Sequence, residues 1–385
     1  MLNLIHILTR SIQLANRLNM ETGNRRLTSL DAFRGYTVAA MIMVNFPGSW
    51  DHVFGTLNHS EWNGLSFTDL VAPFFLFIVG LSIALSHERH RTSGAPKGPL
   101  YRRILVRSLK IFAVGMFLNA MPFFKLDELR WTGTLHRIAV VFAVCAPLFL
   151  NTGWRAQLAL LVAILAAYWF AMTQIPVPGE GAVVLEPGRN LAAWVDSRWL
   201  PGKMWQETWD PEGILSTFPA IATCITGMLA GRVMMTPGWD EDRKTAAVMT
   251  AGVVSAALGY FVGLHFPVNE NLWTSSFVLV TSGFAALVFG AFHFITHTLG
   301  RTGWTRPGVV FGMNAIAAYV MGDLLSLLFY RLPIGGASLN QHVVDGLIRI
   351  GMDPRLASLC YALFFVSIVF VPVWLLWRKR VFIKL

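Results

Sequence analysis

The chain has 385 residues, of which 55% are hydrophobic and only 14% are charged, and its formal net charge is +10. Soluble domains contain about 25% charged residues, and no soluble globule of this length hides so much apolar side chain from water. Long apolar runs exclude a disordered chain, and three cysteines are too few for a disulfide scaffold. The composition therefore predicts a polytopic membrane protein.

The first 26 residues carry apolar side chains at helical spacing, and Arg10 interrupts their apolar stretch. This predicts a cytoplasmic amphipathic segment at the membrane interface and argues against a cleaved signal peptide. Residues 27–385 follow as one transmembrane domain, because they contain successive apolar tracts long enough to cross a bilayer. The predicted fold is an all-α helical membrane bundle of about ten transmembrane helices. These are expected at 35–50, 67–86, 104–121, 134–150, 156–174, 214–233, 246–265, 273–297, 308–330 and 355–377.

Most of the 31 lysine and arginine residues lie in segments that share one side of the membrane if the amino terminus is cytoplasmic. Acidic residues collect on the other side, mainly in the long loop at about 175–213. The positive-inside rule then predicts that both termini are cytoplasmic. We interpret the basic excess as mainly a determinant of topology, with a smaller share open to anionic lipids or a phosphorylated cytoplasmic ligand. No nucleic-acid partner is expected.

Polar residues concentrate at the outer end of the first helix pair, in the segment NFPGSWDHVFGTLNHSEWNGLSFTDL, residues 45–70. Polar groups at membrane depth are costly and are functional candidates by default. A lone His59 would be an ordinary interfacial histidine. The same face, however, also receives Arg137 and the segments 209–218 and 267–273, and this convergence favours a functional site.

Two further charged residues lie within or at the ends of predicted spans. Arg137 is expected to pair with Asp69 or to share a polar network with it, which would relieve the cost of two intramembrane charges. Asp69 would then either orient the His59 loop or contact a ligand directly. Asp323, within the ninth span, is expected either to bond between helices or to line a ligand path.

Several ordered motifs resemble the heparan-α-glucosaminide N-acetyltransferase family, over about 26–330. They are RLTSLDAFRG (26–35), MVN ending at Asn45, NHSEWNGLSFTDLVAPFFLFIVGLSIALS (58–86), TLHRIAVVFAV (134–144), DPEGILSTFPAI (210–221), PVNENLWTSSF (267–277) and GMNAIAAYV (312–320). The chain looks like a short, bacterial-type member without the luminal domain of the animal enzyme. It departs from the family at His136, where a glutamine usually precedes the arginine.

The resemblance implies acetyl transfer from cytoplasmic acetyl-CoA, a co-substrate, to the amino group of glucosamine or a terminal glucosaminide at the periplasmic face. It also implies a homodimer, surrounded by lipid, in the bacterial inner membrane. The family's catalytic histidine and asparagine fall on His59 and Asn45. Histidine suits general-base work near neutral pH, and an asparagine amide can donate to a developing oxyanion. An alternative route places the acetyl group on His59 itself.

The ligand-binding residues expected from this reading form two sets. The acceptor set is Asp69, Trp62, Asn63, Arg137, Asp210, Glu212, Asn269 and Asn271. The donor set is Arg34, Arg102, Arg103, Arg107, Lys110, His293 and Asn314, in which the basic cluster suits the phosphates of CoA. No metal is expected, since the three cysteines lack metal-ligand spacing.

Two other functions fit the same features. Broken helices and buried polar groups also occur in secondary transporters, here for an amino sugar, although no inverted repeat is evident. An O-acyltransferase acting on a hydroxyl of a cell-envelope glycan or a lipid is the second alternative. Acetyl transfer to glucosamine by the purified protein would separate these functions.

Overall fold

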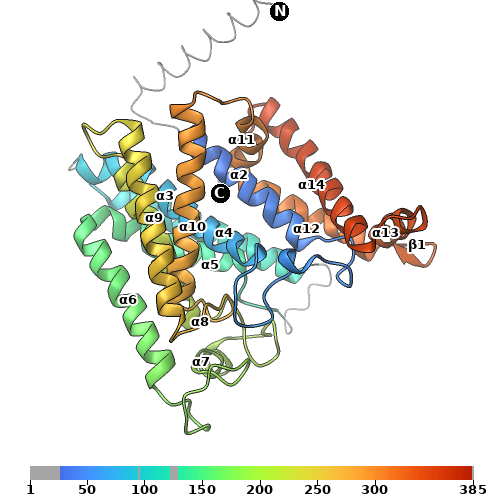
Figure 1. Ribbon diagram of the computed structural model, residues 1–385, viewed down its shortest axis with the longest axis horizontal. Coiled ribbons are helices and arrows are strands. Elements are labelled where there is room, and N and C mark those ends of the chain that lie inside the picture. The colour runs from blue at the N-terminus through green and yellow to red at the C-terminus, as the bar shows by residue number, and fades with distance from the viewer. Residues whose placement is uncertain (1–26, 94–95, 122–128, 384–385) are drawn as a thin grey trace, which may run out of the picture.

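The computed structural model describes residues 27–93, 96–121 and 129–383, and over this part the fold is a bundle of helices (Figure 1). The predicted amphipathic segment 1–26 lies outside the described residues. The elements, in chain order, are α2 (Thr28–Asn45), η1 (Gly55–Leu57), α3 (Thr68–Thr92), α4 (Gly98–Ala120), α5 (Thr134–Asn151), α6 (Trp154–Gln174), α7 (Leu191–Trp199), α8 (Ile214–Met234), α9 (Glu241–Gly263), α10 (Ser275–His293), η2 (Phe294–Thr298), α11 (Thr305–Met313), α12 (Ala315–Arg331), β1 (Pro333–Ile334), β2 (Ala337–Ser338), α13 (Leu339–Arg349) and α14 (Pro354–Arg378).

Local sequence explains where several helices begin. Asp240 and Thr274 precede α9 and α10, and each side chain accepts a hydrogen bond from the backbone NH three residues on. Asp353 caps α14 in the same way, and Pro354 occupies the first helical position, where its missing NH costs nothing. β1 and β2 form a two-stranded antiparallel hairpin that leads into α13.

Seven helices in the described part of the chain are long and apolar enough to cross a membrane: α3, α5, α6, α8, α9, the α10–η2 pair and α14. α11 and α12 form a bent pair, with an angle of 82° at Asn314, that would make an eighth span. The chain is thus a helical membrane bundle, as predicted. α2 and α4 overlap two of the ten predicted spans but are not among these seven helices. α4 carries the basic residues Arg102, Arg103, Arg107 and Lys110. Ten spans therefore remain a prediction.

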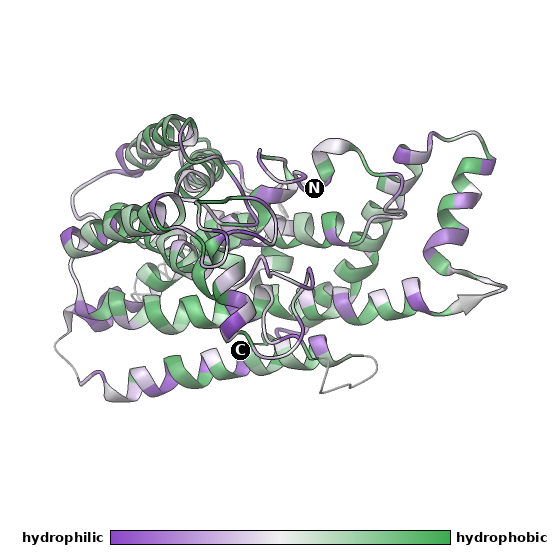
Figure 2. Ribbon diagram, turned by 90° about the horizontal axis from the view of Figure 1, so that it is seen from below, coloured by the Kyte–Doolittle hydropathy of each residue, from purple (hydrophilic) through white to green (hydrophobic). Residues whose placement is uncertain are grey.

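The bundle has a buried centre and an apolar rim. In α3, α5, α8 and α10 most residues of the apolar stretch are buried, whereas in α6, α9 and α14 fewer than a third are. Hydrophobic residues dominate the long helices, and hydrophilic ones gather in loops and at helix ends (Figure 2). Exposed apolar side chains on the outer helices match a lipid environment.

Small residues allow the central helices to approach closely. A Cβ atom at Gly80 of α3 would clash with the Cys224 carbonyl of α8, and one at Gly227 would clash with the Phe77 carbonyl of α3. Close backbone contact of this kind is typical of membrane helices, where packing rather than water drives association. The α3–α8 pair thus forms a rigid centre for the segments that carry polar groups.

Candidate functional site

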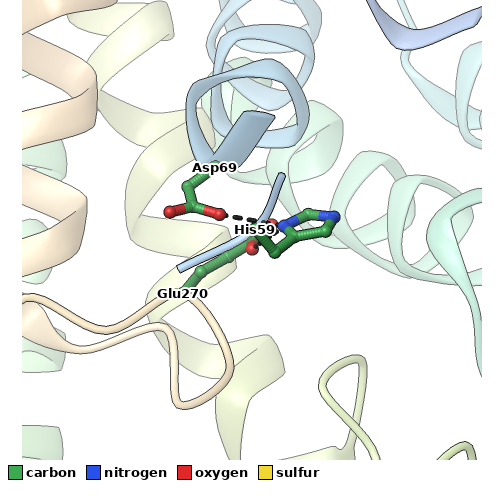
Figure 3. Close-up of side chains that lie close together, drawn as sticks. All are labelled: His59, Asp69 and Glu270. Carbon is green, nitrogen blue, oxygen red and sulfur yellow. Dashed lines mark hydrogen bonds and ion pairs between the residues drawn. The ribbon is translucent and has the colours of Figure 1, made fainter. Parts of the chain in front are cut away.

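The side chains of His59, Asp69 and Glu270 meet at one site, although Glu270 lies far from the other two in the chain (Figure 3). His59 lies in the loop between α2 and α3, Asp69 in the first turn of α3, and Glu270 in the loop between α9 and α10. Nδ1 of His59 lies 2.9 Å from Oδ1 of Asp69 and 2.6 Å from Oε2 of Glu270. The Asp69 side chain is fully buried, while 51% of the His59 side chain is exposed. One edge of the imidazole is therefore held from within the protein, and the ring remains accessible.

Asp69 is fixed by its own loop. Its Oδ2 accepts hydrogen bonds from the Ser60 hydroxyl at 2.7 Å and from the Ser66 NH at 2.8 Å. The Ser66 hydroxyl in turn accepts from the Asp69 NH, so the two residues cap the start of α3 reciprocally. With Oδ2 occupied in this way, Oδ1 is left to accept from His59.

A second loop brings Glu270 to the site. The Gly64 NH donates to the Val268 carbonyl at 2.8 Å, and Gly64 has a φ of 129° that favours glycine. Asn269 Nδ2 donates to Asn63 Oδ1 at 3.2 Å. These bonds join the His59 loop to the 267–274 segment and place Glu270 against the imidazole.

The two carboxylates change the acidity of the site. Partial burial alone lowers the pKa of His59, but the hydrogen bonds to Asp69 and Glu270 raise it more strongly, to about 10. Burial raises the pKa of Glu270 to about 7, against the opposing effect of the His59 hydrogen bond. At neutral pH the resting imidazole is thus protonated, and the Asp69 carboxylate stabilises the cation together with the ionised fraction of Glu270.

The same three residues could also hold a metal ion. Nδ1 of His59 and one oxygen each of Asp69 and Glu270 all lie within 4.8 Å of one another. One imidazole and two carboxylates form a reasonable donor set for a divalent cation. The absence of a metal from the function remains a prediction.

Asn45, the predicted oxyanion donor, is the last residue of α2 and is exposed. Within the described ranges its side chain forms no hydrogen bond, with His59 or with any other residue. Trp62, from the acceptor set, donates from Nε1 to the Leu185 carbonyl at 2.9 Å and packs edge-on against Trp209 at 5.3 Å between ring centroids. Asn271 is half-buried and likewise forms no hydrogen bond with the residues that the structure describes.

The expected pairing of Asp69 with Arg137 is wrong. The Arg137 Nη2 donates to the Pro211 carbonyl at 2.7 Å and to the Ser216 hydroxyl at 2.5 Å, and its guanidinium lies 4.7 Å from the Trp273 ring centroid. The oxygens of Asp69 are already occupied by its own loop and by His59. Arg137 instead ties α5 to the start of α8.

Asp210 and Glu212 are engaged by Arg130, which the sequence analysis missed. Arg130 makes two hydrogen bonds to Asp210, at 2.6 and 2.7 Å, and one to Glu212 at 2.5 Å. Burial raises the pKa of Asp210, but Arg130 and Thr132 hold it below its ordinary value. Both acids are therefore committed to an ion-pair network between the loops that precede α5 and α8.

A cavity of about 1270 Å³ opens among α2, α3, α4, α5 and the α11–α12 break. Five predicted donor-binding residues line it: Arg34, Arg102, Arg103, Arg107 and Lys110. In the described part of the chain, Arg102, Arg103 and Lys110 form no ion pair, whereas Arg107 stacks 4.9 Å from the Phe142 ring centroid. The remaining wall is largely apolar and includes Phe75, Val79 and Ile138.

His293 and Asn314, which were also predicted to bind the donor, are not among the residues that line this cavity. His293 is fully buried, with Nδ1 3.1 Å from the Ser29 hydroxyl and Nε2 3.0 Å from Glu241. Asn314 bonds to the backbone of Val381 and Ile383. Their polar atoms connect packed segments instead of facing a ligand.

His136 is buried against Phe112, with 4.6 Å between ring centroids, and its Nε2 has no hydrogen-bond partner among the described residues. Asp323, the other polar residue without a clear role, lies half-buried on α12. Neither residue is among those that line the cavity.

Comparisons with known proteins place the chain in a family. A family model described as heparan-alpha-glucosaminide N-acetyltransferase, catalytic, matches residues 26–264. The human and mouse heparan-alpha-glucosaminide N-acetyltransferases are each 28% identical to the chain over 87% of its length. The chain spans 59% of the length of these relatives.

Proposed function

Because this chain belongs to the heparan-α-glucosaminide N-acetyltransferase catalytic family, we propose that it transfers an acetyl group from acetyl-CoA to the amino group of glucosamine or a terminal glucosaminide. One observation carries the proposal. The same helical bundle contains an imidazole, that of His59, hydrogen-bonded to two carboxylates, and a cavity with basic residues and largely apolar walls. The imidazole supplies acid–base chemistry, and the cavity suits a cofactor with phosphates at one end and a long thin arm.

The cavity points toward the His59 site. Its lining on α3 runs from Ser86 to Phe75, which corresponds to about 16 Å of helix. Asp69 lies six residues beyond Phe75 on the same helix, or about 9 Å. In our proposal Arg102, Arg103 and Lys110 bind the phosphates of CoA, and the pantetheine arm follows the apolar wall of α3 so that the thioester reaches the acceptor.

The proposed topology follows from the charges. The basic mouth of the cavity faces the cytoplasm, where acetyl-CoA is made, and the His59 site faces the periplasm. Ten spans, with α2 and α4 included, and two cytoplasmic termini satisfy this arrangement and the positive-inside rule. We place the protein in a bacterial inner membrane, as a homodimer within lipid.

The chemical step is a direct transfer. The acceptor amine attacks the thioester carbonyl, a C–N bond forms, and the amine proton passes to Nε2 of His59. Asn45 donates from its amide to the oxyanion of the tetrahedral intermediate. The C–S bond then breaks, and the thiolate of CoA takes up a proton. The two carboxylates on Nδ1 stabilise the imidazolium that forms, as the aspartate does in a serine-protease triad.

The high pKa of His59 has a kinetic consequence. Only the neutral imidazole can accept a proton, and at neutral pH it is the minor form because the pKa is about 10. The same stabilisation makes the neutral imidazole a strong base once the proton has left. The proposed enzyme therefore becomes more active as the pH rises above neutral.

The test is transfer of labelled acetyl from acetyl-CoA to glucosamine by the purified, membrane-reconstituted protein. We expect His59→Ala to abolish transfer, because a general base contributes about 10²- to 10⁴-fold. His52→Ala, in the same loop but without a side-chain partner in the described structure, is the matched control and should remain active. Retained activity in His59→Ala would refute the site.

Other outcomes of this assay would redirect the proposal. Uptake of amino sugar without acetylation would identify a transporter, and activity only toward hydroxyl acceptors would identify an O-acyltransferase. An acetylated His59 that forms with acetyl-CoA alone and passes its acetyl group on would replace direct transfer by a covalent route.

A further inference from the structure

The three residues Pro47–Ser49, which follow Asn45 and Phe46, are bound by elements near the end of the chain. Tyr330 of α12 donates to the Pro47 carbonyl at 2.6 Å, and Asn340 of α13 donates from Nδ2 to the Gly48 carbonyl at 2.9 Å. From α14, the Ser358 hydroxyl accepts from the Ser49 NH at 3.0 Å and donates to the Ser49 carbonyl at 3.1 Å. The Gly48 NH donates to the Ser358 carbonyl at 3.2 Å.

Close packing against α13 and α14 also holds Pro47–Ser49 in place. A Cβ atom at Gly48 would come within 2.5 Å of Val344 and 2.9 Å of both Ser358 and Tyr361, so only glycine fits between α13 and α14. Asn340 is 7% exposed and Ser358 is 2% exposed. Buried hydrogen bonds that lack competing water fix a backbone strongly. The segment therefore has one position relative to α12, α13 and α14.

Asn45 depends on this anchoring because its position follows from the backbone on either side of it. It occupies the last helical position, where helices fray, and the described residues give its amide no hydrogen bond. An oxyanion donor must be placed to within a fraction of an ångström, and an error of 1 Å can cost about 100-fold in rate. The position of the Asn45 backbone is fixed by α2 on its N-terminal side and by Pro47–Ser49 on its C-terminal side.

We infer that α12, α13 and α14 form a clamp on Pro47–Ser49 that positions Asn45 for acyl transfer, with Tyr330, Asn340 and Ser358 as positioning residues. All three lie beyond residue 264, where the match to the catalytic family model ends. The C-terminal part of the chain thus contributes to the reaction through its hold on the backbone next to Asn45. The inference rests on the proposed function, because it requires Asn45 to act in transfer.

The test compares Asn340→Ala and Tyr330→Phe with Gln341→Ala in the full-length reconstituted protein. Gln341 lies beside Asn340 and caps α13 without touching Pro47–Ser49, so it controls for a loosened α13. We expect kcat to fall about tenfold or more in both clamp variants, with an unchanged KM for acetyl-CoA and no such fall in Gln341→Ala.

Each clamp substitution is then combined with Asn45→Ala. If the clamp acts through Asn45, the double variants are no slower than Asn45→Ala alone; a purely structural role would make the losses multiply. Multiplied losses, or unchanged kcat in both clamp variants while Asn45→Ala is impaired, overturn the clamp alone. Full activity in Asn45→Ala overturns the oxyanion role as well as the clamp.

Discussion

The His59 site and the basic cavity hold their polar side chains in opposite ways. Around His59 every carboxylate has defined partners, and two loops are joined by backbone and side-chain hydrogen bonds. In the cavity, Arg102, Arg103 and Lys110 form no ion pair with the residues that the structure describes, and the walls are largely apolar. Fixed side-chain geometry suits a site where covalent bonds form and break. Cations on long flexible side chains without an ion-pair partner suit the binding of a ligand that carries phosphates.

This contrast predicts separable kinetic defects. Changes around His59 should act on kcat, because the interactions there develop in the transition state. Changes in the cavity mouth should act on the KM for acetyl-CoA, since phosphates far from the thioester contribute uniform binding.

Asp69→Asn should lower kcat by about 10²- to 10⁴-fold, because the amide no longer provides the charge that orients and stabilises the His59 imidazolium. Steady-state rates with saturating acetyl-CoA measure the effect. Asp51→Asn, an exposed acid in the same loop, is the matched control and should behave like the unmodified protein. A defect confined to KM would place Asp69 in binding and weaken the contrast.

Replacing Arg102 and Arg103 together by alanine should raise the KM for acetyl-CoA about 10- to 100-fold at unchanged kcat, because charge-assisted hydrogen bonds to phosphate are lost. Replacing Arg155 and Arg243 together by alanine, which removes two exposed cations outside the cavity, controls for net charge. Isothermal titration with CoA checks binding without turnover. An equal loss of affinity in the control would mean that total charge, rather than this cluster, attracts the donor.

Glu270→Gln should shift the rising limb of the kcat/KM profile to lower pH. The carboxylate raises the pKa of His59, so its removal lowers that pKa, and the neutral, active imidazole then appears at a lower pH. Deprotonation of the acceptor amine affects both proteins equally, so the difference between the two profiles isolates His59. Superimposable profiles would show that His59 does not control the limb.

The sequence predicted much of this arrangement because the signals were local. Apolar tracts located the long helices, and the basic residues predicted to bind the donor lie together in the wall of one cavity. Orientation of the His59 loop was one of the two roles predicted for Asp69, and the two residues, which are hydrogen-bonded, are only 10 positions apart in the chain.

The misses were contacts between distant loops. Glu270 stands between the predicted Asn269 and Asn271 but was not selected, and it meets His59 across 211 residues of chain. Arg137 was assigned to the wrong partner, because two charges at the same depth do not reveal which helices adjoin. The binding of Pro47–Ser49 by Asn340 and Ser358 likewise depends on tertiary packing that no periodicity encodes.

The smallest expected effect is that of a chelator. Nδ1 of His59 lies 2.6 and 2.9 Å from two carboxylate oxygens, and these are hydrogen-bond lengths, so the three side chains are spaced to share a proton. Transfer should therefore continue at its full rate after dialysis against EDTA, with the metal content checked by elemental analysis. Loss of activity that added zinc or manganese restores would make His59, Asp69 and Glu270 a metal site. The imidazole would then be a metal ligand instead of a base. The contrast would then be between a Lewis-acid site and a phosphate-binding cavity, with no proton transfer to His59.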